Sequence, residues 1–196
     1  YRPKRLVPNS EIVDRIESSD EWIQQRTGIE SRRFAGADES VVDMAIGAAE
    51  QALNRAKLTI TDVDAVVVST ITYPHQAPSA ATAVIQRMGH PTAAAFDISA
   101  ACAGFCYGVA MAHDMVRAGS AKKVLVIGVE KISDFTDPTD RATAFIFADG
   151  AGAVIIGEST EPGIGPVEWG SDSENRDAIL MNPSWIEVRN TETQLT

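Results

Sequence analysis

Residues 96–119 read FDISAACAGFCYGVAMAHDMVRAG, and this stretch decides which fold the chain adopts. Residues 93–99 predict a short strand that ends at a run of small residues. From residue 102 to residue 115, nearly every turn carries Ala, Val, Met, Phe or Tyr, which predicts one long helix buried on all sides. A strand, a turn of small residues and a buried helix in succession favour an α/β fold.

Cys102 stands at the predicted start of this helix and is therefore a candidate nucleophile. Backbone N–H groups at a helix N-terminus lack intrahelical partners, and the positive end of the helix dipole favours a thiolate. The small neighbours Ala100, Ala101, Ala103 and Gly104 leave room for a reactant to approach the sulfur. The pattern predicts a cysteine that attacks an electrophile.

The alternative is that Cys102 is a small buried hydrophobe, which is the commoner role of cysteine. Cys106 fits that alternative, because it lies one turn further along the helix, where the dipole has faded. A disulfide between the two is not expected, since positions i and i+4 of one helix rarely reach disulfide geometry.

The composition is that of a globular protein with enough residues to bury a core. The 196 residues are 44% hydrophobic and 22% charged, and the formal net charge is −10. This charge argues against a nucleic-acid partner, because phosphate binding needs a basic surface. No apolar run approaches the ~20 residues of a membrane span, and the start does not resemble a signal peptide. The cysteine pair gives no disulfide framework, which favours a reducing cytoplasm.

The remaining pattern predicts strands that alternate with helices, and therefore a mostly parallel sheet with helices on both faces. Helices are predicted at Val41–Ala56 and from Pro78 to about Met88, where proline is expected at the first helical position. The further strands are predicted at residues 63–70, 123–129 and 151–157. No HExxH, CxxC or other metal-ligand spacing is present, and the glycine-rich DGAGA of residues 149–153 predicts a tight turn.

Two helix starts are predicted near the N-terminus. Asn9 is expected to cap a short helix, and Ser18 with Glu21 forms a capping-box pattern for a second helix at Asp20–Thr27. Gly28 is expected to end this second helix.

Trp22 and Arg26 are spaced i, i+4 and share one face of that second helix. An indole beside a guanidinium is able to hold the adenine and phosphates of a nucleotide. Spacing alone equally allows a core tryptophan covered by arginine, so this alternative stays open at the level of the sequence.

Three segments together resemble 3-oxoacyl-[acyl-carrier-protein] synthase III, a family of the thiolase superfamily. They are SSDEWIQQRTGIESRR at residues 18–33, AACAGF at 100–105 after FDIS, and TDRATAFIFADGAGAVII at 139–156. The resemblance implies an α/β thiolase-like fold with a buried nucleophile helix. It also implies that residues 1–196 form the N-terminal half domain, without the family's first strand and second half.

The resemblance further implies roles for individual residues. Cys102 matches the acylated cysteine. The coenzyme A site is expected to include Ser18, Trp22, Arg26 and Arg141, and the acyl pocket is expected to include Phe147 and Ala77. Ala77 corresponds to a position that in some family members carries a large aromatic residue closing the partner subunit's pocket. Its methyl group predicts a preference for a longer or branched primer.

The activity implied by the resemblance is transfer of an acyl group from acyl-CoA to Cys102 and its condensation with malonyl-acyl carrier protein, with loss of CO2. Histidine and asparagine residues of the family's second half assist this condensation. The resemblance implies a cytoplasmic homodimer that needs no metal or other cofactor, since coenzyme A is part of the substrate. Two alternatives remain: a polyketide-pathway acyltransferase that uses the same cysteine without condensation, and a non-catalytic homologue that binds acyl carrier protein or coenzyme A.

Overall fold

The computed structural model describes residues 1–161, 163–181, 184 and 186–187. The chain divides into two compact units, residues Tyr1–Ile164 and Gly165–Thr196, which are described separately.

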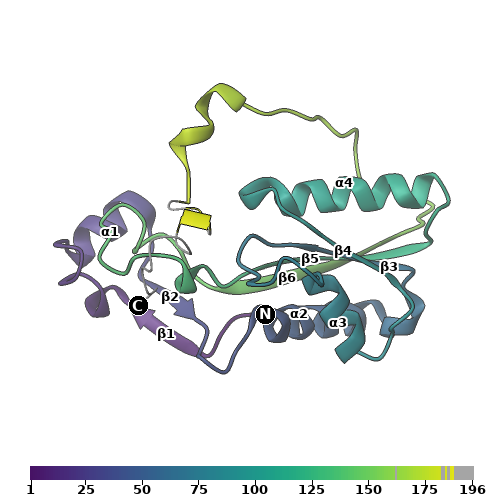
Figure 1. Cartoon of the computed structure of the whole chain (residues 1–196), viewed down its shortest axis with the longest axis horizontal. Helices are drawn as coiled ribbons and strands as arrows, with labels where there is room; N and C mark the ends of the chain where they lie inside the picture. Colours follow the sequence, from purple (N-terminus) through teal and green to yellow (C-terminus); the bar gives the residue numbers. More distant parts are fainter. Residues whose placement is uncertain (162, 182–183, 185, 188–196) are drawn as a thin grey trace. The chain divides into compact units, whose positions relative to one another are not determined.

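The first unit holds six strands and four α-helices (Figure 1). The strands are β1 (Arg5–Pro8), β2 (Ser31–Phe34), β3 (Ala65–Ser69), β4 (Ala94–Ile98), β5 (Lys123–Glu130) and β6 (Gly150–Gly157). The α-helices are α1 (Asp20–Thr27), α2 (Val41–Ala56), α3 (Ala80–Arg87) and α4 (Gly104–Arg117). Short 3-10 helices occupy Asn9–Glu11, Ile60–Asp62, Ala101–Ala103 and Ile132–Asp134.

The central sheet has four strands in the order β4-β3-β5-β6. Strand β3 pairs in parallel with β4 on one side and with β5 on the other, and β6 pairs antiparallel with β5. The mostly parallel α/β fold expected from the sequence is therefore confirmed. Because β3, β4 and β5 run in the same direction, their carboxyl ends lie at one edge of the sheet, where α/β proteins commonly place their sites.

The sheet is covered on both faces, which explains why its strands are apolar without alternation (Figure 1). Val66 and Val68 of β3 belong to the core formed with α2 and α3. Val67, which points the opposite way, belongs to the core formed with residues of α4. Each of these valines is 0% exposed, so β3 is the buried centre of the sheet.

Helix α2 has the predicted bounds and a capping box, in which Ser40 accepts from the Asp43 N–H and Asp43 accepts from the Ser40 N–H. Helix α1 also has the predicted bounds and ends at Gly28, which adopts φ 71°. Its cap differs from the prediction: Ser19, rather than Ser18, accepts from the Trp22 N–H at 3.2 Å. The sequence does not show which of the two adjacent serines caps the helix, because either hydroxyl is able to accept from an N–H group in the first turn.

Two other helix starts also differ from the prediction. Helix α3 begins at Ala80 with Ser79 as its cap, because the Ser79 hydroxyl accepts from the Thr82 N–H at 3.1 Å. Pro78 therefore precedes the helix. Asn9 is the first residue of a 3-10 turn and does not cap it; its side chain is buried and bonds to other segments.

Helix α4 is only partly buried, which corrects the expectation of a helix buried on all sides. Its fully buried positions are the small residues Gly104, Gly108, Ala110 and Ala112, whereas Cys106 is exposed. In the described part of the chain, α4 packs on the sheet through one face only. Small residues on that face allow the helix to approach closely: a Cβ added at Gly108 would lie 2.9 Å from Val126.

Strands β1 and β2 form a separate antiparallel pair. With α1 and residues 144–145 they enclose a small apolar core, whose buried members are Val7, Ile12, Ile16, Ile23, Ala144 and Phe145. Residues 144–145 belong to the segment between β5 and β6 and are remote from α1 in sequence. The small core therefore brings two of the family-like segments together.

The second unit, within the residues described, contains a 3-10 segment at Ser173–Ala178. Its larger apolar side chains are exposed, among them Trp169, Ile179 and Ile186.

Candidate active site

Cys102 lies in the 3-10 turn Ala101–Ala103, between the end of β4 and the start of α4. The sequence predicted the first residue of the helix itself, so the thiol stands slightly before the position expected. Ala101 adopts φ 44°, a left-handed conformation that costs energy for a residue with a side chain. Ala103 donates to the Ala100 carbonyl at 3.1 Å and closes the turn. The sharp reversal of direction leaves Cys102 exposed.

Gly104 fixes the start of α4 against the end of β3. A Cβ built at Gly104 would lie 2.0 Å from the Ser69 Oγ, which no real contact allows. Ser69 is the last residue of β3 and is buried. The residues from Ala100 to Gly104, which we call the Cys102 turn, are therefore seated on the carboxyl end of the neighbouring strand.

The Cys102 turn opens on a cavity of about 370 Å³. Its wall comes from the end of β3 at Ser69, from residues 128–130 at the end of β5, and from residues 148–152 at the start of β6. Gly128 and the glycines of residues 148–152 have no side chains, so the backbone itself forms much of the wall facing the sulfur. The strand predicted at residues 151–157 is confirmed, and β6 begins one residue earlier, at Gly150. Residues 150–153 therefore belong to the strand itself rather than to a tight turn leading into it.

Glu130 is a carboxylate in this wall that the sequence analysis did not select. Its side chain accepts from the Ile71 N–H at 3.0 Å, from the Thr72 N–H at 3.1 Å, and from the Thr72 hydroxyl at 2.6 Å. Burial raises the pKa of Glu130 despite these hydrogen bonds. The one signal in the sequence is its position directly after an apolar strand, at the edge where the sites of α/β proteins occur.

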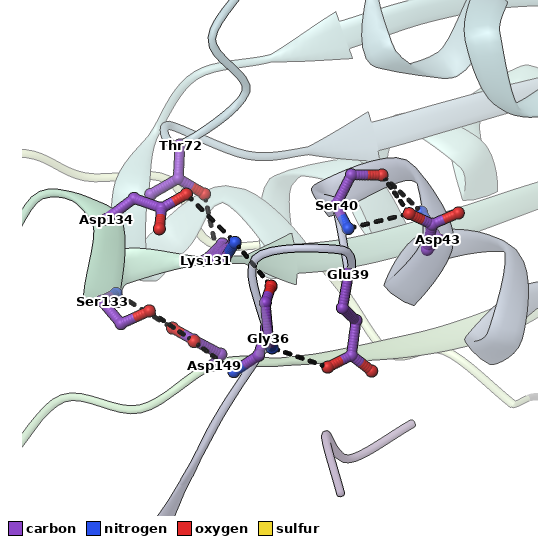
Figure 2. A network of polar contacts seen from close by, with 10 residues as sticks. Gly36, Glu39, Ser40, Asp43, Thr72, Lys131, Ser133, Asp134 and Asp149 are labelled. Carbon is purple, nitrogen blue, oxygen red and sulfur yellow. Dashed lines mark hydrogen bonds and ion pairs between the residues drawn. The ribbon is translucent and has the colours of Figure 1, made fainter. Parts of the chain in front are cut away.

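Asp149 is the other carboxylate in the cavity wall. It is buried, whereas Glu130 is half-buried, and it too is missed by sequence motifs. It accepts from the Ser133 N–H at 2.9 Å and from the Ser133 hydroxyl at 2.6 Å (Figure 2). It also accepts from the Ala35 N–H at 2.7 Å. Ser133 and Ala35 also line a neighbouring cavity of about 270 Å³. Asp149 therefore ties together the wall that separates the two cavities.

Lys131 extends this polar network towards α2. It is buried, its Nζ donates to the Gly36 carbonyl at 3.0 Å, and it lies 3.4 Å from an Asp134 carboxylate oxygen (Figure 2). Its backbone N–H donates to the Thr72 hydroxyl at 2.8 Å. Because Thr72 in turn donates to Glu130, the loop after β3 and the end of β5 form one connected hydrogen-bonded network.

The structure brings Trp22, Arg26 and Arg141 together, as the resemblance implies. The Arg26 guanidinium carbon lies 4.7 Å from the Trp22 ring centroid, and that of Arg141 lies 5.5 Å from it. Phe145 contacts the same indole edge-on, with ring centroids 5.4 Å apart. We call these four residues the Trp22 cluster. Arg26 and Arg141 are exposed, so their positive charges face solvent rather than the core.

The other residues predicted for the site lie apart from the Cys102 cavity. Phe147 is 37% exposed and lines the neighbouring cavity instead. Ala77 is exposed in the loop before α3. The Ser18 hydroxyl is buried and has no hydrogen-bond partner among the described residues. No pattern in the sequence indicates that this hydroxyl is buried.

The described part of the chain contains no group of three or more His, Cys, Asp or Glu residues placed to hold a metal ion. Over the same residues, no helix is both long and apolar enough to cross a bilayer.

Comparison with known proteins identifies the family. A family model described as 3-Oxoacyl-[acyl-carrier-protein (ACP)] synthase III matches residues 96–173. The beta-ketoacyl-[acyl-carrier-protein] synthase III 1 of Streptomyces coelicolor is 52% identical over 189 residues, which cover 96% of this chain and 55% of that protein. The synthase III of Mycobacteroides abscessus is 53% identical over 187 residues, covering 95% of this chain and 55% of that one.

Solved structures agree. The priming beta-ketosynthase from the R1128 polyketide biosynthetic pathway superposes with a TM-score of 0.93 at 42% identity, over 96% of this chain and 57% of that one. The 3-oxoacyl-[acyl-carrier-protein] synthase III of Aquifex aeolicus gives a TM-score of 0.79 at 42% identity, over 82% of this chain and 52% of that one. The chain spans about half the length of the curated relatives it matches. In sequence and in its thiolase-like fold, it belongs to the 3-oxoacyl-[acyl-carrier-protein] synthase III family.

Proposed function

We propose that the protein is a 3-oxoacyl-[acyl-carrier-protein] synthase III that takes its acyl group from acyl-CoA. The observation that carries the proposal is the pairing of an exposed thiol in a strained turn with a separate aromatic–arginine cluster. The first supplies a nucleophile, and the second offers an indole face and two cations, which suit an adenine and its phosphates. Relatives with about 50% sequence identity to this chain bear the name of this enzyme.

In the first step, the Cys102 sulfur attacks the thioester carbonyl of acyl-CoA. The carbon–sulfur bond to coenzyme A then breaks, and coenzyme A leaves as a thiol with the proton that Cys102 gives up. The oxyanion that forms during this exchange is proposed to accept hydrogen bonds from backbone N–H groups at the start of α4, because N–H groups in the first turn of a helix lack intrahelical partners. The glycine-rich wall of the cavity leaves space for the acyl group beside the sulfur.

In the second step, malonyl-acyl carrier protein loses CO2. The electron pair of the broken carbon–carbon bond attacks the acyl-cysteine carbonyl, Cys102 leaves as a thiolate, and 3-oxoacyl-acyl carrier protein is released. We assign no residue of this chain to the decarboxylation. Malonyl-acyl carrier protein is proposed as a substrate from the family relationship.

The test is to incubate the protein with acyl-CoA, map the adduct by peptide mass spectrometry, and then add malonyl-acyl carrier protein. An acyl group on Cys102 followed by release of CO2 and 3-oxoacyl-acyl carrier protein supports the synthase. Acylation without condensation points to a polyketide-pathway acyltransferase that uses the same cysteine. Coenzyme A binding without acylation points to a non-catalytic homologue.

We also propose that two copies associate. Strand β4 is an edge strand: within the described residues it pairs with β3 alone, and its other edge presents unpaired backbone groups. A twofold axis beside β4 would pair this edge with itself in antiparallel fashion and extend the sheet across both copies. Sedimentation equilibrium tests this association, and a monomer at micromolar concentration would contradict it. A reducing, cytoplasmic location is proposed with it, consistent with two free thiols.

The primer is proposed to be longer or more branched than acetyl, on the basis of the small side chain of Ala77. Each additional buried methylene adds about 0.8 kcal/mol of binding. Comparing kcat/KM for acetyl-, isobutyryl- and octanoyl-CoA, with Ala77→Phe as the matched variant, tests this assignment. A parent enzyme that prefers acetyl-CoA, or a variant with unchanged preference, would remove Ala77 from the specificity determinants.

A further inference from the structure

Arg32 is a buried cation whose position is not explained by an ion pair. It lies on β2, where its backbone is paired with Val7, and the residue as a whole is 5% exposed. Among the described residues, no carboxylate lies within ion-pair distance of its guanidinium, and its buried Nε has no hydrogen-bond partner. Burying an uncompensated charge is expensive, and an apolar side chain of similar size usually serves stability at least as well.

The guanidinium instead donates hydrogen bonds to two segments that are far apart in the sequence, residues 7–9 and residue 145. Its Nη1 donates to the Val7 carbonyl at 3.2 Å, and its Nη2 donates both to the Asn9 side-chain oxygen and to the Phe145 carbonyl, the latter at 3.3 Å. The contact with Phe145 is the important one, because it reaches the segment between β5 and β6. Phe145 packs edge-on against Trp22, and its near neighbour Arg141 lies over the same indole.

Asn9 carries the same network to the other half of the Trp22 cluster. Its Nδ2 donates to an Asp20 carboxylate oxygen at 2.6 Å and to the Ile29 carbonyl at 2.7 Å. These two residues flank α1, the helix that bears Trp22 and Arg26: Asp20 is its first residue, and Ile29 follows its C-cap glycine. Arg32 and Asn9 therefore connect the helix that carries the indole to the loop that carries Arg141.

We infer that Arg32 is a positioning residue for nucleotide recognition: through Asn9 and the Phe145 carbonyl it fixes the separation between the Trp22 indole and the Arg141 guanidinium. This inference rests on the proposed use of the Trp22 cluster to bind the nucleotide of acyl-CoA. Arg32 touches neither the Cys102 turn nor its cavity, so its effect is confined to substrates that carry a nucleotide.

The experiment compares two acyl donors in the intact enzyme. One is acyl-CoA, and the other is the acyl thioester of N-acetylcysteamine, which has the same reacting carbonyl and sulfur but no nucleotide. Arg32→Met is expected to raise KM for acyl-CoA about tenfold with kcat for Cys102 acylation nearly unchanged, since the loss is one of substrate positioning. The kcat/KM for the N-acetylcysteamine thioester is expected to stay within about twofold of the parent value.

Two further variants separate positioning from general destabilisation. Arg32→Lys keeps the charge but not the planar fork that reaches several acceptors, so an intermediate rise in KM for acyl-CoA is expected. Arg33→Met is the matched control, because Arg33 is the next residue of β2 and also donates to backbone carbonyls, those of Pro3 and Lys4, without reaching the 141–147 loop. Arg33→Met is expected to leave unchanged the ratio between the kcat/KM values for acyl-CoA and for the N-acetylcysteamine thioester.

The outcomes distinguish this inference from the proposed function. If the parent enzyme acylates Cys102 from acyl-CoA but Arg32→Met and Arg32→Lys affect both donors equally, or neither donor, the positioning role is wrong and the function stands. If Arg32→Met does not fold, Arg32→Lys decides by the same ratio. If the parent enzyme shows no acylation from acyl-CoA, the proposed function itself fails.

Discussion

The Cys102 turn and the Trp22 cluster are assembled in opposite ways. The Cys102 turn is made from consecutive residues, in which strand, left-handed alanine and helix start follow one another along the chain. The Trp22 cluster joins α1 to residues 141–145, and a buried hydrogen-bonded network holds the two parts at their distance. In the proposed enzyme, the position of the nucleophile is therefore a local property of the chain, whereas nucleotide recognition depends on long-range packing. Each of the following changes tests one side of that division.

The largest effect is expected for Cys102→Ala, which removes the proposed nucleophile and should lower acylation by more than a thousandfold, as for other nucleophile deletions. Cys106→Ala is the matched control, since Cys106 is also an exposed thiol but lies within α4 beyond the turn. Mass spectrometry of the acyl-enzyme measures both. If Cys106 were acylated while Cys102 remained free, the assignment of Cys102 as the nucleophile would be wrong.

Gly104→Ala should break the Cys102 turn without removing the thiol. The added methyl group would meet the Ser69 Oγ at 2.0 Å, so the Ser69 side chain or the start of α4 must shift, at a cost of about 1–3 kcal/mol in the free energy of unfolding. Both acyl donors should then react more slowly, because the sulfur itself is displaced. Among the described residues, no atom lies within 4 Å of a carbon added at Gly163, so Gly163→Ala serves as the control for urea unfolding and acylation rates. If Gly104→Ala and Gly163→Ala had the same stability towards urea and the same acylation rates, Gly104 would not be needed to position Cys102.

Trp22→Ala should weaken recognition and leave the Cys102 turn intact. The variant loses the indole face proposed to stack on the adenine, and base–aromatic stacking of about 1–3 kcal/mol corresponds to roughly a tenfold or larger rise in KM for acyl-CoA. The N-acetylcysteamine thioester should react as with the parent enzyme. A double-mutant cycle with Arg141→Met measures the coupling directly, and strictly additive effects would mean that the two side chains act separately.

The smallest effect is expected outside both regions, at the cap of α2. Hydrogen bonds from Ser40, with a further contribution from Arg87, lower the pKa of Asp43 to about 2. A carboxyl group whose pKa is lower in the folded protein stabilises it above the ordinary value of 3.8, and this contribution is lost as the pH falls towards 2. Asp43→Asn should therefore cost about 1 kcal/mol at pH 7 and progressively less between pH 4 and pH 2.

Thermal unfolding as a function of pH measures the Asp43 effect. The variant should retain the parent ratio between the two acyl donors, which makes it the reference for a loss of stability without a loss of site geometry. A changed donor ratio would mean that general destabilisation mimics the effects assigned to the Trp22 cluster.

The sequence alone predicts the elements whose causes are local. The apolar period of Val41–Ala56, the β-branched run of β3 and the glycine after α1 each act within a few residues, and the structure confirms them. Where two neighbouring residues offer equivalent chemistry, as Ser18 and Ser19 do, the sequence cannot choose, because the choice depends on which hydroxyl the fold leaves exposed.

Cys102 could be selected from the sequence because everything that distinguishes it, the strand, the small neighbours and the helix start, lies beside it in the chain. Trp22, Arg26 and Arg141 could be named from family motifs, but only the tertiary structure places Arg141 over the indole. Arg32 and Asp149 have no local signature, and Glu130 has only its place at the end of an apolar run. Each of the three has hydrogen-bond partners that are far away in sequence. Burial of such polar groups is tolerated only when distant segments supply their hydrogen bonds, and that supply exists only once the chain has folded.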